Sequence, residues 1–135
     1  MFLLDTNIIS ELRKGKPKQS AAVRAWAAKV PASQLYLSAV TMLELEIGVL
    51  RMERKDAKQG AVLRGWLTQV GQQFSTQMLP FSVEAAALCG AMHVPDPCSF
   101  RDSMIAASAL QHSLTLVTRN TADFEGLQVP LLNPF

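Results

Sequence analysis

Short apolar runs alternate with longer segments of helical periodicity along this chain, and no other feature constrains the fold as strongly. The runs have the composition of buried strands, while the longer segments carry apolar residues at helical spacing. This alternation predicts an α/β domain with a mainly parallel sheet and helices on both faces. We expect strands within 1–4, 34–40, 77–81, 114–120 and 121–135, and helices within 6–16, 20–30, 41–53, 61–74, 82–93 and 101–113.

Helix boundaries are indicated by capping residues and by breaks in the pattern. Ser20 and Ser82 stand where helix N-caps are expected, and Asp5 or a neighbouring polar residue can cap the first helix. In the segment 41–53, Leu43, Ile47 and Leu50 share one helical face. The polar run 51–60 is expected to turn the chain between two long helices, whose apolar stripes suit either a dimer surface or packing within one subunit.

The 135 residues are expected to form one domain over 1–135, because the length fits a single core and no linker or repeat interrupts it. No apolar stretch is long enough for a membrane span, and no basic segment precedes a hydrophobic run as in a signal peptide. We therefore expect a cytoplasmic protein, with Cys89 and Cys98 as free thiols.

Charge is distributed unevenly along the chain. Residues 1–64 contain 11 Lys and Arg against 6 Asp and Glu, whereas residues 65–135 contain 2 against 5. A basic half suits a polyanionic partner, but on charge alone solvated helix faces are the favoured explanation. The basic residues best placed to contact such a polyanion are Arg13, Lys14, Lys16, Lys18 and Arg101.

Four acidic residues fall outside the polar surface runs. Asp5 follows the first strand, Glu44 begins a helix among apolar residues, Asp102 begins the alanine-rich helix, and Asp123 follows the strand at 114–120. In a parallel sheet, strand C-termini and the following helix N-termini share one edge, where ligand sites form. We expect the four carboxylates to gather at that edge.

Such a cluster suits a hard divalent cation, since Mg²⁺ prefers oxygen ligands and can neutralise mutually repelling carboxylates. The chain lacks a set of His and Cys residues with zinc spacing. Each residue also has a purely structural explanation, because Asp5 can cap a helix, Glu44 and Asp102 can favour a helix N-terminus, and Asp123 can stabilise a turn.

Four segments resemble, in the same order, those of PIN-domain ribonucleases, and in particular the VapC/FitB-type toxins of bacterial toxin–antitoxin pairs. The segments are LLDTNIISEL, SAVTMLELEIGV, RDSMIAASAL and LTLVTRNTADF. The resemblance covers almost the whole chain and implies an α/β/α fold and a Mg²⁺- or Mn²⁺-dependent endoribonuclease. Family members cut structured RNA, often tRNA or rRNA, are inhibited by a cognate antitoxin and commonly dimerise.

The resemblance also implies residue roles. Asp5, Glu44 and Asp102 match the ligands of a first metal, and Asp123 matches a fourth acid that completes the pocket or helps to hold a second metal. The polar residues that match positions beside the pocket are Thr6, Asn7, Thr118 and Asn120. Arg101, directly before Asp102, is expected to contact RNA phosphate, pair with a carboxylate or remain solvated.

The expected mechanism is direct hydrolysis, in which the metal activates water and offsets charge on the phosphate. It predicts products with a 5′-phosphate and a 3′-hydroxyl. Two alternatives stay open: a non-catalytic module that binds RNA or a partner, and a metal-dependent nuclease that acts on DNA.

Overall fold

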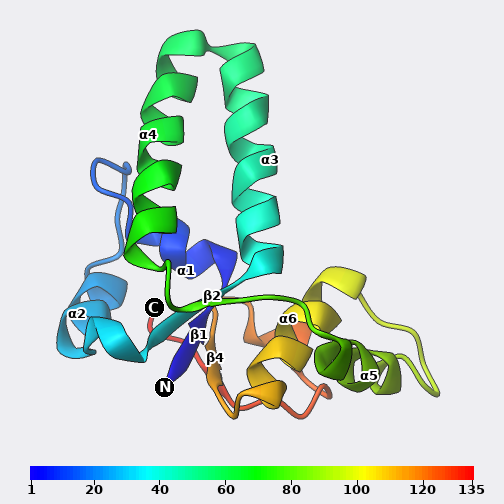
Figure 1. Cartoon of the computed structure of the whole chain (residues 1–135). Coiled ribbons are helices and arrows are strands. Elements are labelled where there is room, and N and C mark those ends of the chain that lie inside the picture. The colour runs from blue at the N-terminus through cyan, green and yellow to red at the C-terminus, as the bar shows by residue number, and fades with distance from the viewer.

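The computed structural model describes residues 1–135 and has a five-stranded sheet in which every strand pair is parallel. The strand order is β3-β2-β1-β4-β5, and Figure 1 labels its three middle strands β2, β1 and β4. Their bounds are β1 Phe2–Leu4, β2 Leu35–Ser38, β3 Met78–Leu79, β4 Thr115–Val117 and β5 Leu131–Leu132. The predicted α/β class and parallel sheet are confirmed.

The central strand β1 pairs with both β2 and β4. Leu3 is in register with Tyr36 on one side and with Leu116 on the other, and the Asp5 N–H donates to the carbonyl of Val117 at 2.9 Å. The chain first builds β2 and β3 on one side of β1 and then β4 and β5 on the other. The side on which successive strands are added therefore changes at β1. A ligand site is expected at such a switch point, at the C-terminal ends of β1 and β4.

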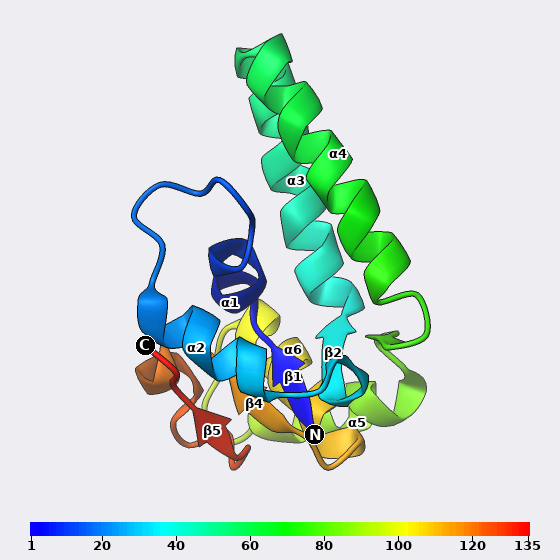
Figure 2. The ribbon, with the colours of Figure 1, turned by 90° about the vertical axis from the view of Figure 1, so that its left-hand side faces the viewer.

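Six α-helices and two short 3₁₀ helices surround the sheet (Figure 2). Ser20 and Ser82 cap α2 and α5 as predicted, since each side chain accepts from a backbone N–H three residues later. No helix is both long and apolar enough to cross a membrane. The helices are α1 Thr6–Glu11, α2 Ala21–Lys29, η1 Ala32–Gln34, α3 Ala39–Lys55, α4 Ala57–Gln73, α5 Val83–Met92, α6 Phe100–Gln111 and η2 Thr121–Phe124.

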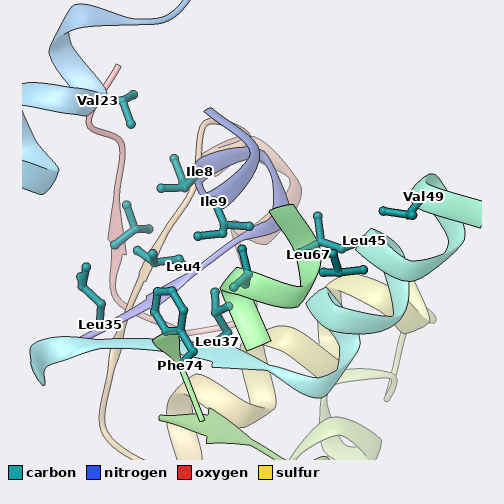
Figure 3. Close-up of a cluster of buried hydrophobic side chains, with 12 residues drawn as sticks. Leu4, Ile8, Ile9, Val23, Leu35, Leu37, Leu45, Val49, Leu67 and Phe74 are labelled. Carbon is teal, nitrogen blue, oxygen red and sulfur yellow. The ribbon is translucent and has the colours of Figure 1, made fainter. Parts of the chain in front are cut away.

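Two hydrophobic clusters cover the two faces of the sheet, because successive strand residues point to opposite faces. Leu4 belongs to a cluster with residues of α1 and α2 and of those turns of α3 and α4 that lie nearest the sheet (Figure 3). Leu3 belongs to a second cluster with Ile105 of α6 and Phe124 of η2. Packing on both faces thus fixes β1, and with it the residue that follows β1.

Helices α3 and α4 form an antiparallel hairpin that projects from the body of the domain (Figure 1). Arg64 of α4 joins them through ion pairs with Glu46 at 2.7 Å and Glu53 at 2.9 Å, both on α3. At the tip, Asp56 ends α3 and accepts from the backbone N–H groups of Lys58 and Gln59. One residue therefore separates the two helices.

The structure corrects several expected boundaries. The polar run 51–60 is almost entirely helical, because its charged residues are the exposed outer turns of the hairpin. The strand expected over 34–40 ends at Ser38, whose side chain caps α3. The first helix, expected to extend to about residue 16, ends at Glu11.

The apolar stripe of α3, which suited either a dimer surface or packing within one subunit, is exposed. Leu43 and Leu50 are 57% and 53% exposed, and Ile47 is exposed beside them. The buried face of α3 is formed instead by Leu45 and Val49. The periodicity predicted the helix correctly, and the face that it marked lies outside the core of the subunit. Cys89 and Cys98 are free, as expected.

Substitution of Gly60 by alanine is expected to destabilise the hairpin. A Cβ atom at Gly60 would lie 2.4 Å from the Cα atom of Glu53, so the two helices would have to separate. We expect the free energy of unfolding to fall by about 1–3 kcal/mol, as measured by urea denaturation.

Gly65→Ala in the same helix is the matched control. A Cβ atom there meets nothing within 4 Å, so this variant should be stabilised by about 0.5–1 kcal/mol. Equal effects of the two substitutions would contradict the close approach of α3 and α4.

Candidate functional site: an acidic pocket around Arg101

Asp5 lies at the centre of the site, directly after β1, and its side chain is fully buried. Oδ1 accepts from the Thr6 N–H at 2.8 Å and from Nη2 of Arg101 at 2.7 Å. Oδ2 accepts from the Thr118 hydroxyl at 2.8 Å and from the Asn7 amide at 3.2 Å. Asp5 therefore caps α1 and also presents its carboxylate to the pocket.

Glu44 reaches the same pocket from α3. Ser38 ends β2 and caps α3, so Glu44 lies on the early turns of the helix that leaves the sheet edge. Its Oε1 accepts from the Thr6 hydroxyl at 2.6 Å, and its Oε2 accepts from Nε of Arg101, also at 2.6 Å. Thr6 thus connects the end of β1 to the start of α3.

Asp102 and Arg101 both come from the first turn of α6. Ser99 caps this helix and accepts from the Asp102 N–H. Oδ1 of Asp102 accepts from Nη1 of Arg101 at 2.6 Å. The three carboxylates predicted for the first metal are therefore brought together, and a guanidinium group lies between them.

Three ion pairs hold the guanidinium group of Arg101 in the pocket. Burial of Arg101 disfavours its charge, but the hydrogen bond to Glu44 and the charge of Asp5 outweigh this effect and raise the pKa of Arg101 above its ordinary value. Three carboxylates surround one positive charge, so the pocket keeps an excess of negative charge.

This donor set fits a divalent cation chemically, since it consists of oxygen ligands that already converge on a cation. Asp5, Glu44 and Asp102 are the residues that could hold the ion. While the guanidinium separates them, no three acidic, His or Cys side chains form a group that could hold a metal ion. In this structure the guanidinium of Arg101 occupies the place between the three carboxylates.

The remaining predicted residues are placed less uniformly. Thr118 and Asn7 both donate to Asp5, and the Asn120 N–H donates to the Thr118 hydroxyl. Asp123 lies on η2, just after β4, and its exposed side chain makes no hydrogen bond or ion pair. The structure thus joins Asn120 to the network through its backbone and leaves Asp123 outside it.

The predicted basic residues follow α1 in a loop. Arg13 and Lys16 line a cavity of about 340 Å³ that also contacts Thr6 and Glu44. Lys14 and Lys18 are exposed elsewhere in this loop. Arg13 and Lys16 therefore line one approach to the acidic pocket, whereas Lys14 and Lys18 do not line this cavity.

Buried Glu11 organises the basic loop. It pairs with Lys16 at 3.0 Å and accepts from the Ser20 N–H. The hydrogen bond from Lys16, followed by that from Ser20, holds the pKa of Glu11 below its ordinary value of 4.5.

Two buried hydroxyl residues of the site were not predicted from the sequence. The Oγ1 atom of Thr41 lies 3.4 Å from the Oγ1 atom of Thr6, and the Ser38 hydroxyl donates to the Thr41 hydroxyl. Both residues are buried among apolar neighbours. The available signal was Ser38 itself, because a serine directly before a helix is a preferred N-cap residue, whereas no pattern marks Thr41 as part of the site.

Comparisons with known proteins agree with this geometry. The family model described as PIN domain matches residues 2–128. Toxin FitB of Neisseria gonorrhoeae is 36% identical, and the match covers 100% of this chain and 99% of that protein. VapC ribonuclease Y4jK of Sinorhizobium fredii is 33% identical, with 100% and 98% covered.

Solved structures show the same fold. The crystal structure of FitAcB from Neisseria gonorrhoeae has a TM-score of 0.90 and 36% identity, covering 99% of this chain and 98% of that one. A toxin–antitoxin complex from Klebsiella pneumoniae has a TM-score of 0.70 and 27% identity, covering 100% and 98%.

Thr118→Val is expected to weaken the support of Asp5. The change preserves shape but removes the buried hydroxyl that donates to Oδ2, so we expect a loss of about 1–3 kcal/mol in the free energy of unfolding. Thr115→Val, in the strand β4 that Thr118 follows, is the control, because the Thr115 side chain makes no hydrogen bond, and it should change stability by less than about 0.5 kcal/mol. Similar losses in urea denaturation would contradict the role of Thr118.

Glu11→Gln is expected to change the pH dependence of stability. A carboxylate whose pKa is lowered by folding stabilises the fold above its unfolded pKa, and this contribution is lost as pH falls through the folded pKa. The unmodified chain should therefore be more stable than the variant at pH 7, and the difference should shrink as pH falls below about 4.5. Urea denaturation across this range measures it.

Glu125→Gln serves as the control, because the exposed Glu125 side chain makes no hydrogen bond or ion pair. A stability difference for Glu11→Gln that is independent of pH would exclude an ionised Glu11 as the anchor of the loop.

Proposed function

The chain belongs to the PIN-domain family, and we propose that it is a metal-dependent endoribonuclease that acts as the toxin of a toxin–antitoxin pair. The observation that carries this proposal is the convergence of Asp5, Glu44 and Asp102 on one cation at the C-terminal edge of a parallel sheet. The ribonuclease and toxin names of relatives that match the full chain support it.

The residues of the pocket have different proposed roles. Asp5, Glu44 and Asp102 would hold Mg²⁺ or Mn²⁺, and when bound, the ion supplies a Lewis acid that activates water and offsets charge on the phosphate. Thr118 and Thr6 orient the carboxylates through the oxygens that face away from Arg101. Asp123 remains a proposed fourth acid, near enough in the chain to β4 to approach from the same edge.

The substrate proposed is RNA, in particular structured RNA such as tRNA or rRNA. Arg13 and Lys16 support this, because they line the cavity that leads to Glu44 and can bind backbone phosphates. Lys14, Lys18 and Arg101 complete the proposed contacts, and Arg101 can reach a phosphate only after it leaves the carboxylates. Direct attack by water would leave a 5′-phosphate and a 3′-hydroxyl.

The proposed partners are a cognate antitoxin and a second copy of the chain, in the cytoplasm. The structural likeness to a toxin–antitoxin complex supports the antitoxin. The exposed side chains of Leu43, Ile47 and Leu50 on α3 support a protein contact on the hairpin.

Asp5→Asn is expected to abolish the activity. The change keeps the size of the side chain but removes the charge that the metal and Arg101 share, so cleavage should fall by about 100-fold or more. We would express the chain inducibly in bacteria, follow growth and map new RNA 5′ ends. The expected result is growth arrest with new 5′-phosphate ends for the unmodified chain, and neither for Asp5→Asn.

Asp96→Asn, in an exposed loop, is the matched control and should arrest growth like the unmodified chain. With purified protein, a chelator should stop cleavage and Mn²⁺ should restore it. Arrest by Asp5→Asn without new RNA ends would favour a binding module, and 2′,3′-cyclic phosphate ends would exclude direct hydrolysis. Preferential cleavage of DNA in competition would exclude RNA as the substrate.

A further inference from the structure

Arg101 uses all three nitrogens of its guanidinium on the acidic pocket. Nε bonds to Glu44 at 2.6 Å, Nη1 to Asp102 at 2.6 Å and Nη2 to Asp5 at 2.7 Å. The three carboxylates belong to the end of β1, to α3 and to α6, so one side chain links three elements. Arginine suits this task because its donors form a rigid planar fork and its charge is permanent.

The oxygens that contact Arg101 are the ones a metal would need. Asp5 Oδ2 is occupied by Thr118 and Asn7, and Glu44 Oε1 is occupied by Thr6. The guanidinium bonds to the other two oxygens, Glu44 Oε2 and Asp5 Oδ1, which also accepts from the Thr6 N–H, and these oxygens face a cation placed between the carboxylates. Arg101 and a metal ion therefore compete for the same atoms.

The balance of charge in the pocket also supports competition between Arg101 and a metal ion. Without a cation, three carboxylates in one pocket would repel each other and destabilise the sheet edge. The guanidinium lowers this repulsion and holds the carboxylates around itself, in an arrangement that forms no metal-binding group. The metal-free protein is thus stabilised by the residue that keeps the metal out.

The guanidinium of Arg101 can also move out of the acidic pocket without unfolding of the domain. Its side chain is 34% exposed, and it belongs to the first turn of α6, directly after an exposed loop. The long flexible stem can turn the guanidinium into solvent while the helix and Asp102 stay in place.

We propose that Arg101 is a built-in counterion that competes with the divalent metal for the acidic pocket, so that metal binds only when the guanidinium is displaced. This inference rests on the proposed nuclease site, and it assigns Arg101 a regulatory role that precedes any contact with RNA. The chain should consequently bind metal more weakly than its three carboxylates alone would allow.

The test measures Mn²⁺ affinity and thermal stability of the purified chain. We would compare the unmodified protein with Arg101→Met, which keeps a long side chain but loses the charge, by electron paramagnetic resonance of free Mn²⁺. Arg101→Met should bind Mn²⁺ about tenfold more tightly or better, because the net charge of the ligand set controls cation affinity. Its Tm without metal should be lower, and Mn²⁺ should raise that Tm by more than in the unmodified protein.

Two further variants control the interpretation. Arg119→Met removes an arginine at the same sheet edge whose guanidinium lies over the Phe135 ring and makes no ion pair, so its Mn²⁺ affinity should be unchanged. Arg101→Lys keeps one positive charge without the fork and should have an intermediate affinity, which also tests the proposal if Arg101→Met fails to fold.

The outcomes separate this inference from the proposed function. Equal or weaker Mn²⁺ binding by Arg101→Met and Arg101→Lys, with binding lost in Asp5→Asn, would overturn the competition and leave the nuclease site intact. Mn²⁺ binding that is unaffected by Asp5→Asn would overturn the metal site itself. Tighter binding by Arg101→Met that Asp5→Asn abolishes in the double variant would support both.

Discussion

The buried charge of Asp5 is the constraint on which the rest of the site depends. A carboxylate without solvent is stable only when hydrogen bonds and a cation replace the lost water. Because its partners come from different elements, the charge of Asp5 joins α1, β4 and α6 to the end of β1. Glu44 and Asp102 enter the same arrangement through their shared cation, so the acidic pocket and the sheet edge stabilise each other.

Much of this architecture could be predicted from the sequence. The alternation of strands and helices gave the parallel sheet, and the position of Asp5, Glu44 and Asp102 after strands or at helix starts gave their common edge. The hairpin tip was misread because a charged run looks like a loop when no neighbouring helix is known. In the structure, Arg64 explains why that run stays helical, since its two ion pairs join α3 to α4.

The position of Arg101 could not be predicted for a different reason. A long flexible side chain next to Asp102 can reach solvent, substrate or the pocket, and sequence spacing does not distinguish these states. Only the convergence of three carboxylates from separate elements selects the pocket. For Asp123 the sequence position was predicted correctly, directly after β4. Its side chain nevertheless makes no contact with the network, because it is exposed on η2.

The central place of β1 also determines when the protein can become active as it is made. The first strand synthesised has β2 on one edge, but its other edge stays open until β4 exists, more than a hundred residues later. Pairing between strands so far apart in the sequence is intrinsically slow, because closing the long connection costs chain entropy. Asp5 meets Thr118 and Arg101 only after most of the chain has been synthesised, so a nascent chain that stops before β4 carries the acidic residues without an assembled acidic pocket.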